Sequence, residues 1–146
     1  ERVEQILEGD VLERSVGAAP GSLGYSLDGE DAAIFDRLPP NTVVALYRIV
    51  QEAINNAVRH AQARTIKVRL GGDNGRARVV IEDDGQGLTN APGRRSGGLS
   101  NMFTRASLIG AELKASACDG GKGTRLELIL PIAEPALRME HQGAGS

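Results

Sequence analysis

The stretch that decides the fold class runs from Thr42 to about Ala63 and reads TVVALYRIVQEAINNAVRHAQA. Its apolar residues recur at steps of three and four, which predicts a long amphipathic helix beginning near the pair Pro39-Pro40. The predicted buried stripe consists of Val43, Tyr47, Val50, Ile54, Ala57, Val58 and Ala61. We therefore expect one long helix whose apolar side faces the core.

On both sides of this helix the sequence predicts strands and turns. Thr65–Leu70 alternates apolar and polar residues, as a half-buried strand does, and Arg76–Glu82 follows as its partner. The turn between them is expected at Gly71–Gly75, where Asn74-Gly75 is the strongest hairpin signal. Further predicted elements are a helix over residues 1–16, a short strand at Gly24–Asp28, a helix at Leu99–Gly110, and a second hairpin of strands Ala111–Ala117 and Thr124–Leu130 around a turn at Cys118–Gly123.

The predicted order is helix, strand, helix, strand hairpin, glycine-rich loop, helix and strand hairpin. Loops are expected at Val16–Gly24, Gly29–Leu38 and Asp83–Gly98. Because the helices do not alternate singly with the strands, a doubly wound parallel sheet is disfavoured. We expect an α+β fold, a two-layer sandwich in which helices cover one face of a mixed, mostly antiparallel sheet.

Composition excludes several classes of protein. The 146 residues carry 17 basic and 19 acidic side chains, a formal net charge of −2, whereas a dedicated nucleic-acid binder needs a basic surface. Cys118 is the single cysteine, which excludes an internal disulfide framework and a cysteine-based zinc cage. No apolar run approaches the ~20 residues that span a bilayer. The nineteen glycines indicate sharp turns or close approach of the backbone to a ligand.

Three polar segments are candidates for chemistry, and the first lies on the long helix. Glu52 and Asn56 are one helical turn apart, His60 follows one turn later, and Arg59 lies at the flank. These residues offer a carboxylate and an amide oxygen to a hard cation such as Mg²⁺, with arginine and histidine for phosphate oxygens. The alternative is an ordinary helix face exposed to solvent.

The second segment is Asp83-Asp84-Gly85-Gln86-Gly87, which follows the apolar run 79–81 after the single residue Glu82. Its functional interpretation is that the carboxylate of Asp83 accepts a hydrogen bond from an exocyclic amine. The two glycines would let the following backbone pass close to a flat ring. The alternative is a simple turn, because Asp-Gly is common where a strand ends.

The third segment is Arg95-Ser96-Gly97-Gly98-Leu99, at the start of the second long helix. A glycine pair at a helix N-terminus presents free N–H groups and the positive end of the helix dipole, which suits phosphate. A flexible loop before a helix is the alternative. The later run Gly121-Lys122-Gly123-Thr124 is not a Walker A loop, since Gly-Lys-Thr is not contiguous and a strand follows it.

Taken in order, these segments resemble the motifs of the GHKL ATPases, which have the Bergerat nucleotide-binding fold. Residues 51–61 are similar to the N box of sensor histidine kinases of the nitrate/nitrite-sensor type. Residues 98–110 are similar to the second glycine box of that branch, and Gly123-Thr124 with the strand ending at Leu130-Pro131 resembles its closing hairpin. The resemblance extends from about Leu38 to Pro131.

The resemblance implies a role for each matching residue. Asn56 would bind a Mg²⁺ ion that bridges the phosphates of ATP, and Glu52 would orient the attacking group or act as a base. Asp83 would accept a hydrogen bond from the adenine amine, and Thr124 would assist in binding the base. The other residues implied in nucleotide binding are Arg59 and His60 near the phosphates, Gly85, Gly87, Gly97, Gly98 and Leu99 around the nucleotide, and the lid residues Arg94 and Arg95.

One departure from the family concerns the phosphate acceptor. Histidine kinases phosphorylate a histidine on a dimerising helical pair, but His60 belongs to the nucleotide box and His141 to a Gly-rich tail. We therefore expect residues 1–131 to be a catalytic domain that binds ATP without phosphorylating itself, and residues 132–146 to be a disordered tail. The helix at 1–16 is expected to continue from an upstream dimerisation domain.

The expected partners are that histidine-bearing dimerisation domain and a response regulator, with no nucleic acid. The domain itself is expected to be a monomer in the cytoplasm, whether or not its parent is anchored in a membrane. Two alternatives stay open, an anti-sigma-factor serine kinase of the same fold and a nucleotide-free interaction module. A gyrase or mismatch-repair type of ATPase is disfavoured, because those proteins carry longer lids and a transducer domain.

Overall fold

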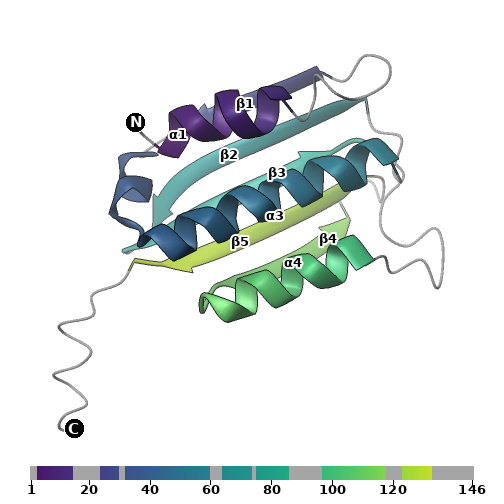
Figure 1. Cartoon of the computed structure of the whole chain (residues 1–146). Helices are drawn as coiled ribbons and strands as arrows, with labels where there is room; N and C mark the ends of the chain where they lie inside the picture. Colours follow the sequence, from purple (N-terminus) through teal and green to yellow (C-terminus); the bar gives the residue numbers. More distant parts are fainter. Residues whose placement is uncertain are drawn as a thin grey trace, which may run out of the picture.

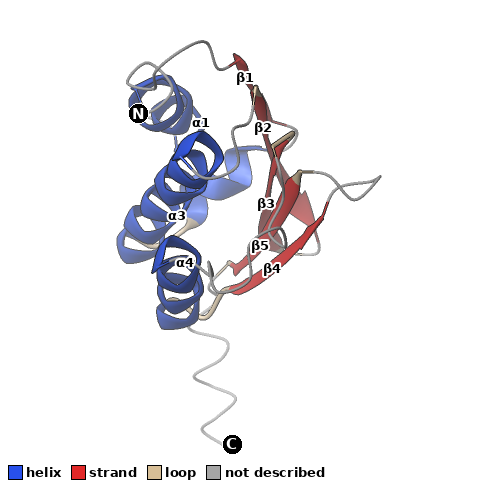
Figure 2. Cartoon of the chain, turned by 90° about the vertical axis from the view of Figure 1, so that its right-hand side faces the viewer, coloured by secondary structure: helices blue, strands red, loops and turns tan. Residues whose placement is uncertain are grey.

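A five-stranded sheet covered on one face by helices forms the domain (Figures 1 and 2). The computed structural model describes residues 3–14, 24–29, 32–59, 64–73, 75–85, 97–117 and 123–132. In chain order the elements are α1 (Val3–Ile6), the π-helical η1 (Leu7–Glu13), β1 (Gly24–Gly29), the 3-10 helix η2 (Ala32–Arg37), α3 (Pro40–Arg59), β2 (Thr65–Asp73), β3 (Arg76–Asp83), α4 (Gly97–Leu108), β4 (Glu112–Ala117) and β5 (Thr124–Pro131). The predicted α+β two-layer architecture is confirmed.

The strands follow the order β1-β2-β3-β5-β4. β1 pairs parallel with β2, and all other neighbours pair antiparallel. The sheet is therefore mixed and mostly antiparallel, as predicted. The last residue of β3, Asp83, is the register partner of Ile66 on β2 and of Thr124 on β5, so three strands meet at this position.

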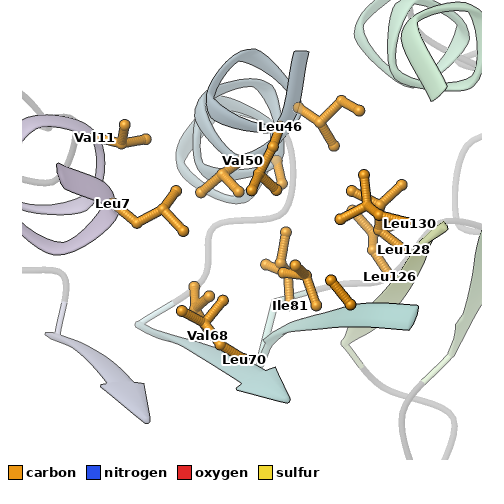
Figure 3. Packing of buried hydrophobic residues seen from close by; sticks show 14 of the residues in the cluster. Leu7, Val11, Leu46, Val50, Val68, Leu70, Ile81, Leu126, Leu128 and Leu130 are labelled. Atoms are coloured by element: carbon orange, nitrogen blue, oxygen red, sulfur yellow. The ribbon is translucent and has the colours of Figure 1, made fainter. Parts of the chain in front are cut away.

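The core is mainly aliphatic, with Phe35 and Met102 also fully buried in it, and lies between the sheet and the helices (Figure 3). Its sheet side is made by alternate residues of the three middle strands, namely Ile66, Val68, Leu70, Ala77, Val79, Ile81, Leu126, Leu128 and Leu130. The other sheet face carries charged side chains joined across strands. Glu82 contacts both Arg69 at 2.8 Å and Arg125 at 3.4 Å, and the Arg78 Nε donates to Glu127 at 2.6 Å.

The buried stripe of α3 is broader than the sequence pattern indicated. Val50, Ile54 and Ala57 are buried as predicted, but Val43 and Tyr47 are only partly buried. Leu46, Ile49 and Ala53, which the predicted stripe omitted, are all buried. The reason is that α3 contacts η1, α4 and the sheet, so more than one side of the helix is covered. The side chain of Val58 and residue Ala61 lie outside the described part of the chain.

Several predicted boundaries differ from the structure. The turn between β2 and β3 is shorter than expected, because Gly71 and Gly72 stay in the strand and pair with Arg78 and Ala77. Gly75, at φ 78°, shows the left-handed conformation that a tight hairpin turn requires. The connection expected at Gly29–Leu38 instead contains η2.

The end of α4 is set by a glycine. The predicted helix 99–110 is observed two residues earlier at both ends, as Gly97–Leu108. Gly110 has φ 72°, its N–H donates to Ser107 O at 3.1 Å, and Ala111 N–H donates to Ala106 O at 2.9 Å. This pair of bonds is a Schellman motif, which satisfies carbonyls that the last helical turn leaves free.

The predicted loop 16–24, the turn 118–123 and the tail beyond residue 132 fall wholly or largely outside the described residues. The proposed domain boundary at residue 131 therefore stays a prediction. Within the described ranges, no helix is both long and apolar enough to cross a membrane.

Candidate functional site

The predicted site segments meet at one end of the molecule. α3 and β3 both end there, and α4 and β5 both begin there, on the right-hand side of Figure 1 and facing the viewer in Figure 2. Chain direction explains this meeting, because β3 is antiparallel to β5 and a connection from β3 leads back to α4. The fold therefore brings together segments that lie more than sixty residues apart in sequence, from Asn56 to Thr124.

Asp83 and Thr124 lie side by side on the face of the sheet that the helices cover. They are register partners, and each falls in step with the inward-facing residues of its strand. Asp83 is partly buried, and Thr124 is 8% exposed. A carboxylate and a hydroxyl thus stand next to each other at the edge of an otherwise apolar layer, an arrangement that can both accept and donate hydrogen bonds to a flat polar ring.

The Asp83 carboxylate is held by the backbone that follows it. Gly85 N–H donates to Asp83 Oδ1 at 2.9 Å. Burial raises the pKa of Asp83, the Gly85 N–H lowers it, the neighbouring charge of Asp84 raises it and the Thr124 N–H lowers it, with a net upward direction. The carboxylate is therefore a partly desolvated hydrogen-bond acceptor, and its electrostatic and hydrogen-bond interactions are stronger than those of a carboxylate on an open surface.

Gly123 lies directly against the backbone of Asp83. It has φ 80°, and a Cβ at this position would overlap the Asp83 carbonyl oxygen and come within 3.4 Å of the Asp84 Cα. Both the left-handed conformation and the lack of space require glycine here. Gly123 therefore lets β5 begin close enough for Thr124 to pair with Asp83.

Asp84 has a different environment from its neighbour. Its Oδ1 accepts hydrogen bonds from Arg64 N–H at 2.7 Å and from Thr65 N–H at 2.9 Å. Asp84 is exposed; the limited desolvation at this position raises its pKa, but hydrogen bonds from Thr65 and Arg64 lower it, and the net direction is downward. Sequence reasoning gave this residue no role, because its partners lie about twenty residues away and nothing local indicates them.

The polar side of α3 is present as predicted. Glu52 and Asn56 are both partly buried and lie one helical turn apart. Arg59 is the last residue of α3, although its side chain falls outside the described part, and His60 lies outside it altogether. The structure thus describes two of the four predicted side chains on this helix.

The glycine pair Gly97-Gly98 forms the first two residues of α4, followed by Leu99. The first N–H groups of a helix have no partner within it, so this terminus can receive an anion. Gly85 is buried beside Asp83. Gly87 and the lid residues Arg94 and Arg95 fall in the range 86–96, which lies outside the described residues.

Comparison with protein families identifies the domain. The family model for histidine kinase-, DNA gyrase B-, and HSP90-like ATPases matches residues 41–134. The chain belongs to this family. The matched range contains α3 from its second residue onward, the Asp83 segment, α4 and the β4–β5 hairpin, which are the elements that meet at the candidate site. The expected membership of the GHKL ATPases is therefore confirmed.

Curated relatives of this GHKL domain are sensor histidine kinases. The sensor histidine kinase MctS of Rhizobium johnstonii is 40% identical over 106 residues, which cover 69% of this chain and 23% of that protein. LiaS, a sensor histidine kinase of Bacillus subtilis, is 40% identical over 88 residues, which cover 60% of this chain and 24% of that protein. The chain thus spans about a quarter of the length of these relatives.

Solved structures have the same fold. The blue-light activated histidine kinase of Erythrobacter litoralis, EL346, superposes with a TM-score of 0.67 at 23% identity, covering 88% of this chain and 43% of that one. The catalytic domain of the histidine kinase ThkA superposes with a TM-score of 0.60 at 12% identity, covering 89% and 88%. At these identities the likeness establishes the fold of the GHKL domain alone.

Proposed function

We propose that this GHKL domain is the ATP-binding catalytic domain of a sensor histidine kinase. It binds Mg·ATP and delivers the γ-phosphate to a histidine on a separate dimerisation domain, for onward transfer to a response regulator. The observation that carries this proposal is the partly buried Asp83 carboxylate beside Thr124, at the end of the domain where α3 ends and α4 begins. The sensor histidine kinase relatives favour a histidine acceptor over the serine of an anti-sigma-factor antagonist.

Adenine recognition is assigned to Asp83. Its carboxylate accepts a hydrogen bond from the exocyclic amine of adenine, and Thr124 supports the base directly or through water. Partial burial supports this role, because a desolvated acceptor rejects a base that lacks the matching donor. Gly85 and Gly87 leave the backbone free to pass close to the ring.

The phosphate end is assigned to α3 and α4. Gly97, Gly98 and Leu99 at the N-terminus of α4 offer N–H groups and the positive end of the helix dipole. Arg59, the last residue of α3, and His60, which follows it in sequence, are assigned to the same phosphates. In this arrangement the anionic part of the nucleotide lies between two helix ends, while the base lies on the sheet.

The donor set on α3 fits a Mg²⁺ ion. Asn56 supplies a partly buried amide oxygen, and a hard cation that keeps most of its ligands as water and phosphate needs only one or two from protein. When bound, Mg²⁺ neutralises phosphate charge. Glu52, one turn earlier, orients the attacking imidazole or accepts its proton.

In the proposed reaction, an imidazole nitrogen of the acceptor histidine forms a bond to the γ-phosphorus of ATP. The bond between that phosphorus and the β,γ-bridging oxygen breaks, and ADP leaves. The domain contributes mainly positioning and charge stabilisation, as is general in phosphoryl transfer. The domain that carries the acceptor histidine is the partner. The amino-acid sequence of residues 51–61 supports assignment to the nitrate/nitrite-sensor branch.

Phosphotransfer in trans tests this function. The domain is mixed with γ-labelled ATP, Mg²⁺ and a purified helical-hairpin acceptor domain from a sensor histidine kinase. We expect an acid-labile, base-stable phosphoryl group on the acceptor, at least about a hundredfold less with Glu52→Gln. The adjacent exposed substitution Gln51→Glu serves as the control. Absence of phosphohistidine, with a serine phosphate formed on an anti-sigma antagonist instead, would contradict the assignment.

A further inference from the structure

Two consecutive carboxylates at the end of β3 have different partners. Asp83 receives the Gly85 N–H at 2.9 Å, two residues away. Asp84 receives the N–H groups of Arg64 at 2.7 Å and Thr65 at 2.9 Å, on a segment that lies about twenty residues earlier in the chain. The Asp84 contacts are thus long-range, whereas the contact of Asp83 with Gly85 is local.

The Asp84 contacts extend the sheet beyond its last regular pair. Ile66 and Asp83 are the final register partners of β2 and β3, and the Asp84 N–H also donates to Thr65 O at 3.4 Å. The carbonyl of Arg64 accepts from Gly24 N–H at 2.9 Å, which adds the start of β1 to the same junction. Asp84 therefore joins the end of β3 to the start of β2 at the point where backbone pairing stops.

We propose that Asp84 is a positioning residue for base recognition, holding the backbone on both sides of itself so that the Asp83 carboxylate stays aimed at the adenine amine. The Gly85 N–H that holds Asp83 Oδ1 belongs to the residue directly after Asp84. If Asp84 moves, the direction of that N–H changes with it. The proposal rests on the function assigned to Asp83 above, and Asp84 itself does not contact the nucleotide.

The backbone of Asp83 is already held on the side of β5, so the contacts of Asp84 on the side of β2 limit how far the following backbone can move. The backbone of Gly123 fills the space beside the Asp83 carbonyl. Loss of the Asp84 side-chain contacts leaves residues 84 and 85 tied to the sheet by the end of β3 and by the bond from the Asp84 N–H to Thr65 O at 3.4 Å. The Asp83 carboxylate then loses the Gly85 N–H first, before the strand pairing with Thr124 is affected.

ATP and GTP distinguish this role from a general effect on stability. Guanine carries a carbonyl oxygen where adenine carries its amine, so a fixed Asp83 carboxylate accepts from ATP and repels GTP. A change that merely destabilises the domain leaves the discrimination of the folded molecules unchanged. A change that frees Asp83 lowers the ratio of ATP affinity to GTP affinity.

The test is calorimetric titration of both nucleotides into the whole chain and its variants, below their melting temperatures. We expect Asp84→Ala to weaken ATP binding about tenfold with little effect on GTP, and Asp84→Asn, which keeps an accepting oxygen, to stay within about threefold of the wild type. The control Glu82→Gln changes a carboxylate on the opposite face of the sheet, and should leave both affinities unchanged.

A folded Asp84→Ala variant with wild-type ATP affinity and wild-type discrimination overturns the positioning role. If Asp84→Ala does not fold, Thr65→Val decides, since it removes only the hydroxyl that also bonds Asp84. A two- to threefold loss for ATP alone supports the proposal, and no loss contradicts it. A wild-type domain that binds neither nucleotide instead contradicts the proposed function on which the role depends.

Discussion

At the scale of single residues, burial of the Asp83 carboxylate destabilises the folded domain at neutral pH. Burial raises its pKa above the ordinary value of 3.8, so folding favours the protonated form. At pH 7 the ionised group lowers the free energy of unfolding, and below pH 3.8, where the group is protonated in both states, the penalty disappears. A residue that costs stability in the free domain is typical of a binding site.

Asp83→Asn should therefore raise the melting temperature of the nucleotide-free domain at pH 7, and the gain should vanish near pH 3. The amide keeps one oxygen for the Gly85 N–H and removes the buried charge. Thermal unfolding at the two pH values measures this. Asp84→Asn is the contrasting control. Because the pKa of Asp84 is lowered in the fold, its ionised form stabilises the fold at pH values above 3.8, and this contribution is lost as the pH falls. Asp84→Asn should therefore lower the melting temperature at pH 7. A lower melting temperature for Asp83→Asn at pH 7 would show that the buried charge does not destabilise the fold.

Gly123 is a second residue whose identity can be tested, because the backbone at this position requires glycine. Gly123→Ala should lower the free energy of unfolding by about 2–4 kcal/mol, because the left-handed conformation and the overlap with the Asp83 carbonyl oxygen both oppose a Cβ. Gly75→Ala is the matched control, since Gly75 has φ 78° with nothing within 4 Å of the added Cβ. It should cost only about 1 kcal/mol. Equal losses in urea unfolding would show that the overlap is absent.

At the scale of elements, α3 shows where sequence periodicity works and where it stops. The helix, its polar side with Glu52 and Asn56, and half of the buried apolar residues that the structure describes in it follow from spacing alone. The prediction missed Leu46 and Ile49 because a single buried stripe assumes a single neighbouring element. In the structure, α3 packs against the sheet and is also contacted by η1 and α4. Which sides of a helix are buried depends on the tertiary structure and cannot be deduced from the sequence of the helix alone.

The packing of α3 gives a prediction at the same scale. Ile49→Ala should lower the free energy of unfolding by about 2–5 kcal/mol, because Ile49 is fully buried and truncation leaves a cavity. Val44→Ala, in the same helix at 53% exposure, should change it by less than about 0.5 kcal/mol. Chemical denaturation of the two variants checks this. Similar losses at both positions would contradict the packing described for α3.

At the scale of the whole molecule, the class of fold and the segments of the site were predictable, but the way they assemble was not. Local sequence patterns indicated each of the five strands that the structure describes, and Asp83 stood out as a carboxylate after an apolar run. Local patterns do not specify that β5 lies between β3 and β4, or that β1 pairs parallel with β2. The bonds of Asp84 to Arg64 and Thr65 depend on that assembly, and so its role emerges only in three dimensions.

The most direct test of the central claim is calorimetric titration of ATP, with and without Mg²⁺, into the wild-type domain, Asp83→Asn and Glu82→Gln. We expect micromolar, Mg²⁺-sensitive binding to the wild type and to Glu82→Gln, and at least a roughly hundredfold loss for Asp83→Asn, since the amide can place a donor against the adenine amine. Equally tight binding of ATP by Asp83→Asn would contradict the assignment of Asp83 and, with it, the proposed nucleotide site.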